Sequence, residues 1–164
     1  MIQAIVYTSS TGHTETYAKL LSERFDVPYY SLKEADKHLR PGKKIIYLGW
    51  VMADTIKGLK TARTTYTIVA TGAVGMNFPR SDNQTKLEEV NQITPLFYLQ
   101  GGLDYTKVKG LKRALLKMIG KQLSKENRPE MKELIQLFQT GGSYVQAKNL
   151  EDLIQFVQKQ NQKK

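Results

Sequence analysis

Short, continuous runs of β-branched and aromatic residues alternate along this chain with amphipathic stretches. The strand-like runs lack regular polar positions, which is typical of parallel strands covered on both faces by helices. Five strands are predicted, at residues 2–7, 27–32, 43–49, 66–71 and 94–100. Helices are predicted at residues 14–25, 33–39, 55–63, 82–90, 111–123, 130–138 and 150–160. This order predicts an α/β fold, a doubly wound parallel sheet with helices on both faces.

The length of 164 residues suits one ordinary domain, so we expect residues 1–164 to form a single domain. The chain contains no cysteine, which excludes thiol nucleophiles, cysteine-bound iron–sulfur clusters and disulfides. Redox activity would therefore need a bound cofactor. The two histidines, His13 and His38, form no metal-binding spacing, and no metal site is predicted. Without a long apolar run or a secretory signal, the sequence indicates a cytoplasmic protein.

Positive charge is concentrated in one part of the chain. Lys and Arg outnumber Asp and Glu by 25 to 15, and residues 105–128 hold eight basic side chains and one acidic one. Apolar residues share one side of a predicted helix there: Leu111, Leu115, Met118, Ile119 and Leu123. Two interpretations stay open, a helix that covers the sheet with a basic solvent face, or a surface for an anionic partner or an acidic membrane. A nucleic-acid partner is not predicted, because no recognition motif accompanies the charge.

The loop after the first predicted strand gathers hydroxyl groups around one glycine and leads directly into a helix. Hydroxyls and free backbone N–H groups at a helix N-terminus can surround phosphate oxygens without a metal or a lysine. The loop lacks the lysine of GxxxxGK[ST] and the glycines of GxGxxG, which disfavours nucleoside triphosphates and dinucleotides. Predicted phosphate-binding residues are Ser9, Ser10, Thr11, Gly12, His13 and Thr14. An ordinary hydroxyl N-cap is the alternative interpretation.

The segment IVYTSSTGHTETYAKLL, residues 5–21, resembles the flavodoxin signature at every constrained position. Those positions are the apolar strand end followed by Ser9, Gly12, Thr14, Ala18 and Leu21. The order of elements extends the resemblance over nearly the whole chain. It implies a flavodoxin-like sheet of order 2-1-3-4-5 that binds FMN, with the 5′-phosphate in the loop 9–14. His13 would then be exposed and offer its backbone N–H, and a catalytic role for its side chain is the alternative.

By the same resemblance, two further loops would lie against the isoalloxazine ring of FMN. The loop after the strand 43–49 would contribute Trp50, Val51, Met52 and Ala53. Trp50 would stack on the ring or pack beneath the loop, and Asp54 or Thr55 would cap the helix 55–63. The loop 71–79 would read the pyrimidine edge, or serve only as a turn, through Thr71, Gly72, Ala73, Val74, Gly75 and Asn77. Phe78 is the candidate for covering the outer ring face.

The stretch LQGGLDY at residues 99–105, followed by a basic segment with KRALLKMI at 112–119, is similar to flavodoxin-type, menaquinone-dependent protoporphyrinogen oxidases. That likeness implies a basic segment around 102–129 beside the flavin, a porphyrinogen substrate, a quinone acceptor and contact of 105–128 with the inner face of the membrane. The flavin would supply the redox chemistry, so the residues identify no catalytic side chain. Two alternatives stay open: a one-electron carrier with an acidic partner, and a binding module without a cofactor.

Overall fold

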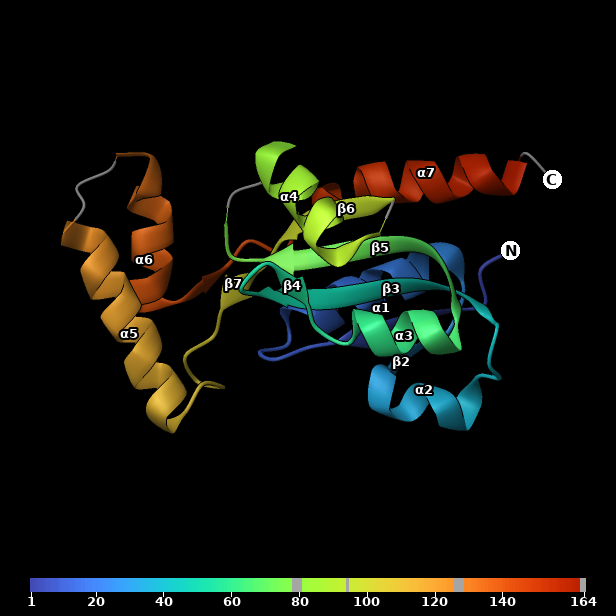
Figure 1. Cartoon of the computed structure of the whole chain (residues 1–164), viewed down its shortest axis with the longest axis horizontal. Helices are drawn as coiled ribbons and strands as arrows, with labels where there is room; N and C mark the ends of the chain where they lie inside the picture. Colours follow the sequence, from blue (N-terminus) through green and yellow to red (C-terminus); the bar gives the residue numbers. More distant parts are fainter. Residues whose placement is uncertain (78–80, 94, 126–128, 163–164) are drawn as a thin grey trace.

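The computed structural model describes residues 1–77, 81–93, 95–125 and 129–162. Its main sheet has five parallel strands in the order β2-β1-β3-β5-β6, at the centre of Figure 1. The strands are β1 (Ala4–Thr8), β2 (Tyr29–Ser31), β3 (Lys44–Met52), β5 (Thr67–Gly75) and β6 (Leu96–Gln100). Numbered in chain order, this is the predicted order 2-1-3-4-5, so the flavodoxin-like α/β fold is confirmed.

Helices cover both faces of the sheet, and each face has its own apolar core. The helices are α1 (His13–Phe25), α2 (Leu32–His38), α3 (Leu59–Thr65), α4 (Ser81–Asn91) and α7 (Glu151–Gln162). α1 and α7 pack on one face, and α2, α3 and α4 on the other. In β1, Ile5 points to the first core and Val6 to the second, as the two-residue period of a strand requires. Burial on both faces explains why the strand sequences show no polar alternation.

The end of β3 differs from the prediction. β3 continues to Met52 and turns back into β4 (Thr55–Ile56), which pairs with it antiparallel. Because β1 ends opposite Gly49, β3 beyond that point needs another partner for its backbone groups, and β4 supplies it. Helix α3 consequently begins at Leu59 after an N-cap at Gly58. The predicted helix 55–63 therefore starts too early, and the prediction that Asp54 or Thr55 caps it is wrong.

A helical pair stands apart from the sheet, on the left of Figure 1. It consists of α5 (Gly110–Lys125) and α6 (Lys132–Thr140), with a short 3-10 turn η1 (Pro129–Met131) before α6. The chain leaves the body through β7 (Gly102–Leu103) and returns through β8 (Gly142–Ser143), and these two strands pair antiparallel. A second 3-10 turn, η2 (Ala147–Leu150), then leads into α7.

The helical pair has a small core of its own. Leu103, Val108, Leu137 and Phe138 are buried there, and Leu116, Ile119 and Leu123 of α5 pack against them. The interpretation of α5 as a cover for the sheet is therefore wrong. Since α5 packs on α6, part of its apolar side stays uncovered: Leu111 is 87% exposed, Leu115 50% and Met118 58%.

Candidate functional site

The carboxyl ends of four parallel strands meet at one edge of the sheet. Thr8 of β1 lies opposite Gly49 of β3, Gly49 lies opposite Ala73 of β5, and Gly75 lies opposite Gln100 of β6. In doubly wound sheets, ligands bind at this edge, where the strand order reverses. The loop after β1, the β3–β4 turn and the chain after β6 therefore border the candidate site.

The loop after β1 turns sharply at Gly12, directly before α1. Gly12 has a left-handed backbone with φ 96° and precedes α1 directly, a conformation that glycine adopts most readily. Its N–H donates to the Ser9 hydroxyl at 3.0 Å. No side chain in this described part of the loop caps α1, so the hydroxyl N-cap interpretation is wrong. The partial positive charge of the α1 N-terminus faces the loop without a side-chain cap.

A lysine lies over this loop, and sequence reasoning did not assign it. The ammonium of Lys107 lies only 2.7 Å from the position that a Cβ would take at Gly12. Lys107 also pairs with Asp104, at 4.0 Å between the charged atoms. Asp104 accepts hydrogen bonds from the Thr106 hydroxyl at 2.6 Å and the Thr106 N–H at 2.9 Å. These bonds, together with Lys107 and His13, lower the pKa of Asp104, which is therefore a carboxylate at neutral pH.

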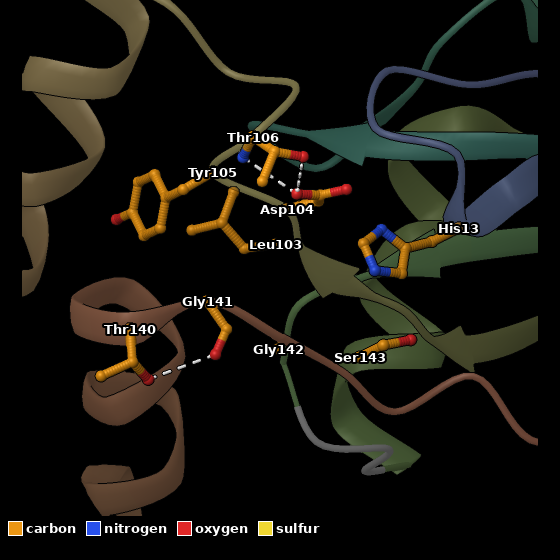
Figure 2. Close-up of a pocket in the computed structure, with 9 residues that line it drawn as sticks. All are labelled: His13, Leu103, Asp104, Tyr105, Thr106, Thr140, Gly141, Gly142 and Ser143. Atoms are coloured by element: carbon orange, nitrogen blue, oxygen red, sulfur yellow. Dashed lines mark hydrogen bonds between the residues drawn. The ribbon is translucent and has the colours of Figure 1, made fainter.

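His13 is half-buried and lines a cavity, contrary to the predicted exposed position (Figure 2). The open cavity has a volume of about 350 Å³. Its lining residues are His13, Leu103, Asp104, Tyr105, Thr106, Thr140, Gly141, Gly142 and Ser143. Burial lowers the pKa of His13 despite the nearby Asp104 carboxylate, so the ring is neutral at pH 7. Nδ1 of His13 hydrogen-bonds the Thr11 hydroxyl at 2.9 Å.

The ring of His13 fits beside the chain after β6 because that chain carries two glycines. A Cβ on Gly102 would lie 2.7 Å from Nε2 of His13, and a Cβ on Gly101 3.7 Å from the His13 Cβ. The glycine pair in LQGGLDY is therefore the sequence signal that could have placed His13 in the interior of the site. It also brings the loop after β1 and the chain that leads to the helical pair to the same cavity.

The β3–β4 turn holds the second group of predicted site residues. Trp50 and Val51 are half-buried at the end of β3, whereas Met52 and Ala53 are exposed at the turn. Lys57, directly after β4, holds its ammonium 6.0 Å from the centre of the Trp50 ring. Asn91 of α4 fixes the turn, since its side chain accepts from the Ile56 N–H and donates to the Asp54 carbonyl, both at 2.8 Å.

The predicted loop 71–79 is wrong over its first five residues, which continue β5 and are buried: Thr71, Gly72, Ala73, Val74 and Gly75. Their glycines serve close packing, because a Cβ on Gly72 would lie 2.4 Å from Leu48 and 2.9 Å from Leu99. Asn77 remains exposed at the sheet edge, and its carbonyl accepts from the Tyr98 hydroxyl at 2.9 Å. Phe78 lies outside the described residues. The role of all these residues toward a flavin stays a prediction.

The residues around Gly12 fit the phosphate end of FMN. A left-handed glycine, an uncapped helix N-terminus and an ammonium over the same corner of the loop offer complementary charge to a phosphate ester. For the ring end, the half-buried Trp50 and the cavity beside His13 border the same edge of the sheet, whereas Gly72 to Gly75 are covered in β5.

Within the described ranges, no group of three or more His, Asp or Glu side chains could hold a metal ion. None of the helices that the structure describes combines the length and the hydropathy needed to cross a bilayer. Comparison with protein-family models, curated proteins and solved structures finds no significant match for the chain. The flavodoxin-like fold therefore rests on the strand order and the helix arrangement alone.

Proposed function

We propose that the chain binds FMN and is a flavodoxin-like oxidoreductase acting on an anionic small molecule. The observation that carries this proposal is the meeting of three features at Gly12: the left-handed corner of the loop, the uncapped start of α1 and the ammonium of Lys107. Together they offer a phosphate monoester positive charge and backbone donors in one place. A hydroxyl-rich turn with a purely structural role would not need a left-handed glycine, an uncapped helix start or a nearby ammonium.

The chain's own residues would bind and orient the cofactor. The loop 9–14 would hold the phosphate, and the β3–β4 turn with Trp50 and Met52 would border the ring. FMN would supply hydride or single-electron transfer when bound. Asp104 and Lys107 would close the site from the side of the helical pair, and the cavity at His13 would receive the substrate.

Two cations beside Tyr105 support a carboxylate-bearing substrate, although Asp104 adds a negative charge to the cavity lining. Arg113 and Lys117 of α5 lie 5.6 Å and 5.9 Å from the centre of the Tyr105 ring, which itself lines the cavity. An apolar ring system with carboxylates can contact Tyr105 and pair with these cations. A porphyrinogen has this chemistry, so we propose activity of the protoporphyrinogen-oxidase type.

The outer side of α5 supports a quinone acceptor at an acidic membrane. Three exposed apolar side chains, Leu111, Leu115 and Met118, follow one another at helical spacing, and α5 carries no acidic residue. Such a helix can lie on an anionic bilayer, each lysine near the surface contributing about 1 kcal/mol. Binding to anionic but not neutral vesicles is the expected result. Replacement of Leu111 and Met118 by Gln should weaken it, whereas Val90→Gln, an exposed position on α4, should not.

The first experiment is an FMN titration followed by desalting and an absorption spectrum. The wild type should retain flavin, and Trp50, the single tryptophan, should report binding by a change in fluorescence. Thr11→Asp should abolish binding with the fold intact, because it sets a carboxylate against the phosphate. A flavin-free wild type would overturn the proposal and favour a binding module.

Experiments on the FMN-bound protein distinguish the proposed oxidoreductase from a one-electron carrier. Bleaching of the flavin by a porphyrinogen without oxygen, and its recovery with a quinone, are expected of the proposed oxidoreductase. Inertness toward the porphyrinogen, with a stabilised semiquinone on reduction by a flavodoxin reductase, would instead identify an electron carrier.

A further inference from the structure

We infer that Lys107 makes the site selective for a phosphorylated flavin, by pairing its ammonium with the phosphate held at Gly12. This inference rests on the proposed function and adds a residue to it that lies far from the phosphate loop in sequence. The loop itself contributes hydroxyls and backbone groups but no cationic side chain. The chain after β6 contributes the cation, at the corner where the loop turns into α1.

The position of Lys107 is set by the residues on either side of it. Tyr105 donates its hydroxyl hydrogen to the Phe138 carbonyl of α6, and Val108 is buried in the core of the helical pair. The Lys107 N–H donates to the Asp104 carbonyl at 3.1 Å, which closes a tight turn. The turn is thus anchored to the helical pair, and the Lys107 side chain extends from it toward Gly12.

The ammonium of Lys107 is available to a ligand. Its side chain is 57% exposed, and its contact with Asp104 is long, at 4.0 Å. An exposed pair of this length contributes little to folding, so a dianionic phosphate would compete well for the ammonium.

The test compares FMN with riboflavin, which has the same ring but no phosphate. We measure the Kd of both ligands for the wild type, Lys107→Gln and Lys109→Gln, a neighbouring exposed lysine that serves as the matched control. Lys107→Gln should weaken FMN binding by at least about tenfold and riboflavin binding by less than about twofold. Lys107→Arg should retain most of the affinity, and Lys109→Gln should leave both Kd values unchanged.

The outcomes separate this inference from the function on which it rests. A wild type that binds FMN with an affinity that Lys107→Gln does not change would overturn the inference and leave the function standing. Equal losses for FMN and riboflavin would also overturn it, since Lys107 would then act on the ring or on the fold. Failure of the wild type to bind either ligand would overturn the proposed function itself.

Discussion

The hydroxyl of Tyr17 donates a 2.6 Å hydrogen bond to the carbonyl of Gln100 and accepts one of 2.6 Å from the side chain of Asn149. Tyr17 lies on α1, Gln100 ends β6 and Asn149 lies in η2, so this buried hydroxyl joins three segments at the site edge of the sheet. This hydroxyl fixes the beginning of the segment after β6, which carries Gly101, Gly102 and the turn of Lys107.

Removal of that hydroxyl should destabilise the protein. Tyr17→Phe leaves the Gln100 carbonyl and one Asn149 donor without this partner, and we expect a loss of about 1–3 kcal/mol in the free energy of unfolding. Urea denaturation measures it. Tyr29→Phe, at a position 37% exposed, is the control and should change stability by less than about 0.5 kcal/mol. Equal stability of Tyr17→Phe and the wild type would contradict this role.

The β3–β4 turn should depend on Asn91 and not on the nearby ion pair. Asn91 bonds Asp54, Ile56 and the Leu87 carbonyl, and Asn91→Ala should cost about 1–3 kcal/mol. Lys86 pairs with Asp54 at 2.6 Å, but both side chains are about half exposed, so Lys86→Gln should cost less than about 1 kcal/mol. Thermal unfolding of the two variants gives the comparison, and the reverse ranking would refute it.

The helical pair should separate when Gly120 acquires a side chain. A Cβ at Gly120 would lie 2.7 Å from the Cβ of Phe138, and the backbone of α6 leaves it little room to move. Gly120→Val should therefore expose residues 104–141 to proteases while the sheet keeps its cooperative unfolding. Ala114→Val, an exposed position on the same helix, controls for the helix propensity of valine. If residues 104–141 of Gly120→Val stayed resistant to proteases, the prediction would be wrong, because α5 and α6 would then have repacked around the valine.

Stability should fall in alkali, in part through Tyr47. Burial raises the pKa of Tyr47 from 10.0 to about 12, so the folded state holds its proton where the unfolded state has lost it. The contribution of the protonated Tyr47 phenol to the free energy of unfolding is complete below about pH 10, and it is lost as the pH rises toward 12. Urea denaturation across this range should show a smaller loss for Tyr47→Phe than for the wild type. Equal slopes would mean that the Tyr47 phenol ionises normally.

The sheet could be predicted from the sequence because burial on both faces leaves continuous apolar runs, and both the strand order and the helix order follow the prediction. Strand ends were less predictable. The residues Gly72 and Gly75 were interpreted as part of a ligand loop, yet they lie in β5 against Leu48, Leu99 and Tyr98. The sequence alone does not distinguish a glycine that makes room for a ligand from one that makes room for a neighbouring side chain.

The place of the loop around Gly12, between β1 and α1, was predicted from local spacing, and its role toward a phosphate stays a prediction. Lys107 was not predicted there, because its place over Gly12 depends on anchors that are distant in sequence, at Phe138 and in the helical pair. Likewise, the predicted apolar side of α5 was only partly right, because Leu111, Leu115 and Met118 are exposed. Ile119 and Leu123 pack against the core of the helical pair instead of the sheet, together with Leu116, which was not predicted. Periodicity identifies an apolar side without identifying what covers it.

The pairing of β7 with β8 brings the two ends of the helical segment together. Leu103 lies opposite Gly142, so the 38 or so intervening residues begin and end at neighbouring points. A tight reverse turn could replace them without moving any strand of the main sheet. The segment that carries Lys107 and α5 can therefore vary in length or sequence while its two points of attachment to the sheet stay in place.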